Sequence, residues 1–116
     1  MTLYYAHAIT LYNTPQEVRD MAVFNTLGFN VINPNAPEHD AGYHAEGMDY
    51  FRRVVNDADG LAFRALPDGS IPAGIAKEIE FCREAGKPVI ELPSGIQRRV
   101  LTVEQTREYI TEVGAR

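Results

Sequence analysis

The chain of 116 residues lacks several features that would assign it to a class of protein at once. It has one cysteine, Cys82, which cannot form an intramolecular disulfide and fits a reducing compartment. No apolar run approaches the roughly 18 residues that span a membrane. The N-terminus lacks the basic start and the long apolar stretch of a signal peptide. We therefore expect a cytoplasmic protein without a membrane partner.

Positive charge is scarce along the chain. Eleven Lys and Arg stand against 16 Asp and Glu, which gives a formal net charge of −5. The basic residues are dispersed, apart from the pairs Arg52-Arg53 and Arg98-Arg99. Binding to a nucleic-acid backbone needs clustered basic side chains. We expect no nucleic-acid polymer as a partner, whereas a small phosphorylated ligand is compatible with this charge.

Three motifs that would specify a chemistry are also missing. There is no G-x-S-x-G for a Ser-His-Asp hydrolase, and no G-x-G-x-x-G follows the first expected strand, which argues against a Rossmann dehydrogenase. No spacing of His, Cys and acidic residues is typical of a metal site. His39 and His44 are expected on a surface loop. We therefore predict no metal centre.

The length indicates a single domain over residues 1–116, with room for one core. Strand-like and helix-like patterns alternate along it. In order, we predict a strand at 3–9, a helix at 14–28, a strand at 29–33, a turn-rich loop at 34–42, a helix at 45–58, a strand at 59–66, a loop at 67–72, a helix at 73–86, a strand at 88–92 and a helix from Thr102.

The first of these helices has a clear start. Thr14 is a suitable N-cap, Pro15 takes the first helical position, and Glu17 completes a capping box. Gly28 ends the pattern. The apolar positions with helical spacing, which we expect to face the core, are Val18, Met21, Ala22 and Leu27.

The alternation predicts an α/β fold with three layers. A parallel sheet of four to five strands, of flavodoxin or Rossmann type, would carry helices on both faces. Ligands of such sheets bind at the carboxyl ends of the strands. Here those ends are residues 7–10, 33–35, 66–72 and 93–95.

Glu78 is the most unusual residue of this pattern. In the helix at 73–86 it falls on the same arc as Ile75, Ile79 and Cys82, at about 100° per residue. An unpaired carboxylate is seldom buried, because desolvating it costs several kcal/mol. Glu78 is either an edge residue that reaches solvent, a member of a buried salt bridge, or a nucleophile or general base near the ligand-bearing edge.

Other candidates lie at or near the same edge. The loop "PDGSIPAG" contains Ser70 and Gly74 and could hold an anion at the helix start, but it is equally an ordinary turn. On the first strand, Tyr4 and His7 point to opposite faces; strand tyrosines usually serve packing, while His7 is well placed for a ligand. Asp49 near the start of the second helix is either a solvated surface acid or the second carboxylate that glycosidic-bond chemistry requires.

The segments "LYYAHAIT", "ADGLAF" and "AGIAKEIEFCREAGKPVIEL" resemble the nucleoside 2-deoxyribosyltransferase family and the related 2'-deoxynucleoside 5'-monophosphate N-glycosidases. The resemblance spans roughly residues 3–101. Its most specific part is a Gly, three residues, a Glu and then "GKPV", met by Gly74, Glu78 and residues 86–89. The resemblance implies that Glu78 attacks C1' of the deoxyribose and forms a glycosyl-enzyme intermediate.

The same resemblance implies roles for further residues. Tyr4 would orient the nucleophile, and Asp49 is the acid nearest to the family's proton donor, whose own position holds Phe51. Pro72 stands where the family has Asp or Ser, so that Asp68 or Ser70 would substitute. His7 stands where the family has Gly and would narrow or re-equip the pocket.

The resemblance also implies an assembly. The segment "PSGIQRRVL" is similar to one through which the monophosphate glycosidases reach a neighbouring subunit's site with a Ser, here Ser94. A homodimer or a higher homo-oligomer follows from that similarity. No metal or redox cofactor is implied.

We therefore expect an enzyme of nucleotide metabolism that cleaves or transfers at the N-glycosidic bond of a 2'-deoxynucleoside or its 5'-monophosphate. Its ligand would be a small nucleoside or nucleotide. Two alternatives stay open: a non-catalytic nucleotide-binding module of the same fold, favoured by Pro72 and His7, and a glycosidase that acts on another ribosylated substrate.

Overall fold

The computed structural model describes residues 1–93, in which strands and helices alternate. The elements are β1 (Thr2–Ala6), the 3₁₀ helix η1 (Ile9–Leu11), α1 (Pro15–Thr26), β2 (Asn30–Ile32), α2 (Pro37–Glu46), α3 (Met48–Asp57), β3 (Gly60–Phe63), α4 (Ala73–Glu84) and β4 (Val89–Glu91). The predicted last helix, from Thr102, lies outside the described residues.

The four strands form one parallel sheet in the order β2-β1-β3-β4. Tyr4 at the middle of β1 pairs with Ile32 on one side and with Leu61 on the other. The predicted α/β fold with a parallel sheet is thus confirmed. The strands are shorter than expected: β1 ends at Ala6, so His7 already belongs to the loop that follows it.

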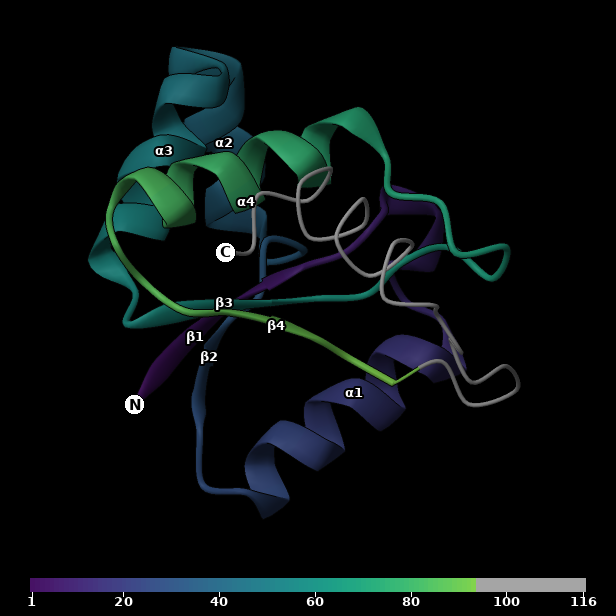
Figure 1. Ribbon diagram of the computed structural model, residues 1–116. Helices are drawn as coiled ribbons and strands as arrows, with labels where there is room; N and C mark the ends of the chain where they lie inside the picture. The colour runs from purple at the N-terminus through teal and green to yellow at the C-terminus, as the bar shows by residue number, and fades with distance from the viewer. Residues whose placement is uncertain (94–116) are drawn as a thin grey trace.

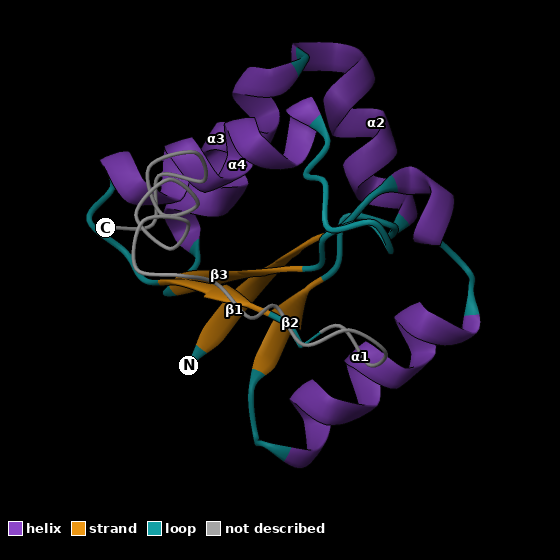
Figure 2. Cartoon of the chain, turned by 45° about the vertical axis from the view of Figure 1, so that its right-hand side comes forward, coloured by secondary structure: helices purple, strands orange, loops and turns teal. Residues whose placement is uncertain are grey.

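Helices cover both faces of the sheet, as Figures 1 and 2 show, with α1 on one side and α2, α3 and α4 on the other. Because side chains alternate along a strand, β1 supplies both layers. Tyr4 packs with Val55 of α3 and Ile79 of α4, whereas Tyr5 packs with Phe24 of α1. The predicted three-layer arrangement is therefore confirmed in this part of the chain.

Helix α1 starts as expected but buries a different face. The Glu17 N–H donates to the Thr14 hydroxyl over 3.4 Å, and Pro15 takes the first position. Of the predicted apolar positions, Met21 packs against the core cluster that contains Leu3 and Tyr5, whereas Val18 and Leu27 are 66% and 65% exposed. The buried residues of α1 are Glu17, Asp20 and Phe24. The carboxylates of Glu17 and Asp20 can face the sheet because each has polar partners between α1 and the sheet.

The segment between β2 and β3 also differs from the prediction. We expected a loop over 34–42 and one helix over 45–58, but α2 occupies 37–46 and carries His39 and His44. Pro37 at its start and acidic residues in its first turn favour helix initiation. Gly47, with a φ of +65°, breaks the segment before α3 in a conformation that suits glycine.

None of the helices within residues 1–93 is long and apolar enough to cross a bilayer.

Candidate functional site

Glu78 lies in the second turn of α4 and faces the sheet. Only 8% of its surface is exposed, and its neighbours Ile75 and Ile79 are buried with it. The Tyr4 hydroxyl donates a hydrogen bond to its Oε2 atom. Within residues 1–93 no Lys or Arg pairs with it, so neither a surface edge position nor a buried salt bridge describes this carboxylate.

The environment of Glu78 favours its protonated form. Burial raises the pKa of this carboxyl to about 7, and the hydrogen bond from Tyr4 opposes the rise. Burial and the neighbouring Glu78 charge also raise the pKa of the Tyr4 hydroxyl, which therefore stays protonated and donates. Near neutral pH the Glu78 carboxyl is thus available in both protonation states.

The sequence predicted Asp49 as the partner of Glu78, and the structure places it elsewhere. Asp49 is exposed in the first turn of α3, and no contact described within residues 1–93 joins it to Glu78. Phe51 is the residue that reaches the site, since its ring lies edge-on to Tyr4 with centroids 6.4 Å apart. The wall of the site on the α3 side is therefore aromatic.

The loop before α4 is an ordinary turn. Asp68 Oδ1 accepts hydrogen bonds from the Ser70 N–H at 2.9 Å and from its hydroxyl at 2.6 Å. The Leu66 N–H donates to the Ser70 carbonyl at 2.9 Å, which closes the turn. Asp68 and Ser70 are both exposed, and a Cβ on Gly74 would meet no heavy atom within 4 Å. No side-chain contact described within residues 1–93 joins Asp68 or Ser70 to Glu78, and Gly74 lies one helical turn before Glu78 on α4.

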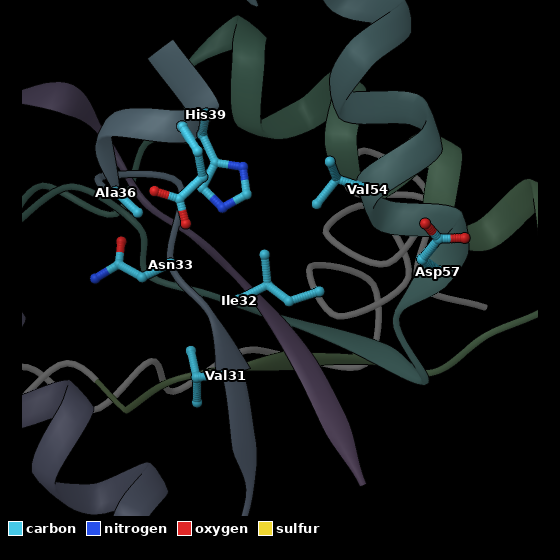
Figure 3. A pocket seen from close by; sticks show the side chains of 8 residues that line it. Val31, Ile32, Asn33, Ala36, His39, Val54 and Asp57 are labelled. Atoms are coloured by element: carbon cyan, nitrogen blue, oxygen red, sulfur yellow. The ribbon is translucent and has the colours of Figure 1, made fainter. Parts of the chain in front are cut away.

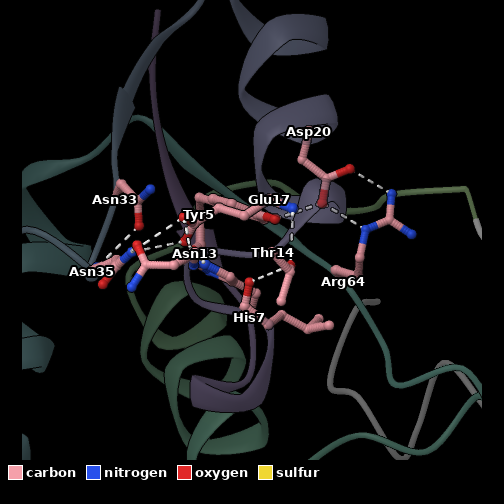
Figure 4. Close-up of polar contacts among 10 residues, drawn as sticks. Tyr5, His7, Asn13, Thr14, Glu17, Asp20, Asn33, Asn35 and Arg64 are labelled. Carbon is pink, nitrogen blue, oxygen red and sulfur yellow. Dashed lines mark hydrogen bonds and ion pairs between the residues drawn. The ribbon is translucent and has the colours of Figure 1, made fainter.

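His7 lies on the α1 side of the sheet, and each of its two ring nitrogens has a polar partner. Its Nδ1 contacts the Tyr5 carbonyl at 3.1 Å, and its Nε2 contacts Glu17 Oε2 at 2.7 Å. Its ring stacks on that of Tyr5, with centroids 3.7 Å apart. Figure 4 shows these residues with Asn35, whose side-chain amide donates to both Glu17 oxygens at 3.1 and 3.2 Å.

Several hydrogen bonds hold the Glu17 carboxylate. Burial raises the pKa of Glu17, but hydrogen bonds from His7, the Asn13 N–H and Asn35 outweigh it and lower the pKa overall. The His7 ring and the Glu17 carboxylate are thus joined in a buried contact of 2.7 Å between Nε2 and Oε2.

A second buried pair lies next to the first. Arg64, directly after β3, donates from Nε and Nη2 to the two Asp20 oxygens at 2.6 and 2.7 Å. The Tyr5 hydroxyl donates to the same carboxylate. Arg64 also donates to the Pro93 carbonyl at 2.9 Å, which joins the segment after β4 to the network.

The sequence analysis missed Glu17, Asp20 and Arg64 as buried residues. One signal was present: Glu17 and Asp20 are three residues apart and so share one face of a helix. Their partners come from β1 and from the segments that directly follow β1, β2 and β3, and only the folded sheet brings these together.

A separate open hollow of about 400 Å³ lies along the β2 edge of the sheet (Figure 3). Val31, Ile32 and Val54 form its apolar wall, and His39 and Asp57 are among its polar residues. His39 is held by the Tyr50 hydroxyl, 2.6 Å from its Nδ1. Neither Glu78 nor Tyr4 lines this hollow, which is therefore distinct from the Glu78 site.

The predictions about a metal site and about Ser94 remain to be compared with the structure. Within residues 1–93, no three His, Cys, Asp or Glu side chains come together in a way that could hold a metal ion. Ser94, which the resemblance assigned to a neighbouring subunit's site, lies outside the described residues.

No protein-family model, no curated protein and no solved structure matches the chain. Residues 1–93 form a small α/β unit with a four-stranded parallel sheet.

Proposed function

We propose that the protein cleaves or transfers at the N-glycosidic bond of a 2'-deoxynucleoside or its 5'-monophosphate, with Glu78 as nucleophile. The observation that carries this proposal is the buried Glu78 carboxylate with the Tyr4 hydroxyl on its Oε2. A desolvated carboxylate held in one orientation suits attack on a carbon that gains positive charge. The spacing of Gly74, Glu78 and the "GKPV" segment supports the same assignment.

The chemistry would proceed in two balanced steps. A bond forms between a Glu78 oxygen and C1' while the bond from C1' to the base nitrogen breaks, and that electron pair leaves with the base, which takes up a proton. Water then attacks C1', the bond to Glu78 breaks, and the sugar leaves with the new hydroxyl group. The proton that the water loses replaces the one that the base took up in the first step. A second base in place of water gives transfer instead of hydrolysis.

Roles for the other predicted residues belong to this proposal. Tyr4 orients Glu78 and holds its charge by a hydrogen bond. Asp49 serves as proton donor only if the first turn of α3 moves toward Glu78, since its side chain is exposed. Contacts of the ligand with His7, Asp68, Ser70 and Gly74, a homodimer completed by Ser94, and a cytoplasmic role in nucleotide metabolism stay predictions from the sequence.

A specific observation favours a second candidate, a non-catalytic nucleotide-binding module. The aromatic Phe51 faces Tyr4 where a second carboxylate would be needed, and Asp49 points to solvent. Such a module would bind a nucleoside or nucleotide without releasing its base. Binding and base release therefore separate the two candidates.

The test is a chromatographic assay for free base with a panel of deoxynucleosides, ribonucleosides and their monophosphates. We expect base release from at least one deoxynucleoside or deoxynucleotide, and a loss of roughly 1,000-fold or more in Glu78→Gln. Glu80→Gln is the matched control, because Glu80 lies on the same helix, is exposed and pairs with Lys77 at 3.6 Å.

The outcomes discriminate among the candidates. Binding by calorimetry without base release would support the binding module. Release from ribonucleosides alone would support a glycosidase for another ribosylated substrate. Full activity in Glu78→Gln would remove Glu78 as the nucleophile, and an added acceptor base distinguishes transferase from hydrolase.

A further inference from the structure

The hollow beside β2 lies at an edge of the sheet. β2 pairs only with β1 in the described part of the chain, so it is an edge strand there. The hollow lies between this strand and the helices α2 and α3, as Figure 3 shows. Its volume of about 400 Å³ falls within the range of ligand pockets. The hollow is therefore large enough for a small organic molecule.

The apolar wall of the hollow is held by the core. Ile32 of β2 and Val54 of α3 line it, and both pack against the core cluster that contains Tyr4. Each of these two lining side chains is only partly buried. A ligand with an apolar body would remove their remaining surface from water, which favours binding. The wall thus has a fixed shape and apolar surface for a ligand to cover.

His39 lies at the end of the hollow that follows β2 (Figure 3). Its Nδ1 is 2.6 Å from the Tyr50 hydroxyl. The Tyr50 ring lies against Gly42 of α2, where an added Cβ would be 2.3 Å from a ring carbon, so a larger residue would displace the tyrosine. The imidazole is therefore held between α2 and α3. Its Nε2 has no hydrogen-bond partner among residues 1–93 and is available to a polar group of a ligand.

Asp57 lies at the opposite end of the hollow, and helix stability does not explain it (Figure 3). It is the last residue of α3, where a carboxylate is unfavourable because the helix dipole ends in partial negative charge. The Lys87 ammonium donates to the carbonyls of Asn56 and Ala58 and forms no ion pair with Asp57. Within residues 1–93 the exposed Asp57 carboxylate thus has no cationic partner.

The charge of the lining selects the class of ligand. Its charged residues within the described chain are Glu38 and Asp57, and no Lys or Arg is among them. Glu38 stands in the first turn of α2, where the helix dipole favours a carboxylate, so it has a structural explanation that Asp57 lacks. An anion such as a nucleotide phosphate would be repelled here, whereas an ammonium group would be attracted.

We propose that this hollow is a binding site for a small organic amine, with its ammonium group against Asp57 and its apolar body across Ile32 and Val54. A polar group at the far end of the ligand contacts His39. The site shares no residue with the Glu78 site, so the proposal is independent of the N-glycosidic reaction. It adds a second ligand, of opposite charge to a nucleoside monophosphate.

The experiment is an NMR titration of the full chain with 2-phenylethylamine, which carries an ammonium group on a short apolar body. Neutral 2-phenylethanol and anionic 3-phenylpropanoate are probes of similar shape that control for charge. We expect the amine to shift the methyl signals of Ile32 and Val54. It should bind about fivefold more tightly than the alcohol, as for one exposed ion pair, and 3-phenylpropanoate should bind most weakly.

Two matched variants test the contact with Asp57. Asp57→Asn should lower the affinity for the amine to that for the alcohol, and leave the affinity for the alcohol unchanged. The fold should persist, because the side chain is exposed. Asp40→Asn makes the same chemical change at an exposed position of α2 that does not line the hollow, so it should bind the amine like the wild type.

The other outcomes overturn the proposal. They are the absence of amine binding, equal affinities of the wild type for amine and alcohol, and unchanged amine binding in Asp57→Asn. Shifts confined to residues outside the hollow would show an adventitious additive only. Glu78→Gln should keep its affinity for the amine, and a loss there would place the amine at Glu78 instead. Base release by the wild type is a separate measurement, so either proposal can fail without the other.

Discussion

Glu17 on α1 and Glu78 on α4 lie on opposite faces of the sheet and are buried to the same degree, with 7% and 8% exposure. Burial raises the pKa of each carboxyl, yet the final directions are opposite. The pKa of Glu78 rises to about 7, because only Tyr4 opposes the effect of burial. The pKa of Glu17 falls, because His7, Asn13 and Asn35 all donate to it.

The comparison shows that burial alone does not decide the state of a carboxylate. The depth of its desolvation and the hydrogen bonds that reach it decide its pKa together. The lowered pKa keeps Glu17 ionised, and its oxygens are occupied by the His7 ring, a backbone N–H and an amide. It is therefore a structural residue that organises the loop after β1. Glu78 keeps acceptor capacity beyond its one hydrogen bond, which is the property a nucleophile requires.

The largest expected effect concerns the stability of Glu78→Gln as a function of pH. The pKa of Glu78 rises from an ordinary 4.5 to about 7 on folding. Its contribution to stability is therefore complete below pH 4.5 and is lost as pH rises through 7. Gln does not titrate, so the stability of Glu78→Gln relative to wild type should increase by about 3 kcal/mol between pH 4.5 and pH 8. Urea unfolding at both pH values measures this difference.

Glu80→Gln controls for the loss of any carboxylate from α4. Glu80 is exposed, so its replacement should change the difference between the two pH values by less than about 0.5 kcal/mol. If the free energy of unfolding of Glu78→Gln and that of wild type changed by the same amount between pH 4.5 and pH 8, burial would not raise the pKa of Glu78.

The second effect has the opposite sign. Glu17→Gln should lower the free energy of unfolding at pH 7 by about 2 kcal/mol, because His7 loses its charged acceptor. A carboxyl with a lowered pKa stabilises the fold above its unfolded pKa, and this contribution is lost as pH falls through the folded pKa. The loss of unfolding free energy in Glu17→Gln, relative to wild type, should therefore become smaller at acidic pH. The stability of Glu78→Gln relative to wild type should instead increase at basic pH. Equal stability of Glu17→Gln and wild type at pH 7 would contradict the ion pair.

The sequence was sufficient to predict Glu78 but not Glu17. On α4 a single carboxylate interrupts the apolar arc of Ile75, Ile79 and Cys82, so its inward position can be recognised from helical spacing. On α1 the inward face itself is polar, and apolar Val18 is exposed. A spacing rule that assigns apolar residues to the core therefore selects the wrong face.

The features that the sequence predicted depend on local patterns, and those that it did not predict depend on tertiary contacts. The parallel sheet and its two covered faces follow from the alternation of strand and helix patterns, which is local information. The partners of Glu17 come from the segment between β1 and α1 and from the segment after β2. Their meeting depends on strand order, which no single segment specifies. The break at Gly47 was visible as a glycine, but its φ of +65° belongs to the packing of α2 on α3.

The smallest expected effect is a pH dependence that belongs to Glu78 alone. Only the ionised carboxylate can attack C1', so kcat/KM should rise with pH through a midpoint near 7. Between pH 6 and pH 8 the ionised fraction increases roughly tenfold. Tyr4→Phe removes the hydrogen bond that lowers this pKa, and its midpoint should move to higher pH. Glu17 is already ionised in this range and adds no second step. A flat profile, or a Tyr4→Phe midpoint at lower pH, would contradict the assignment of Glu78 as the titrating nucleophile.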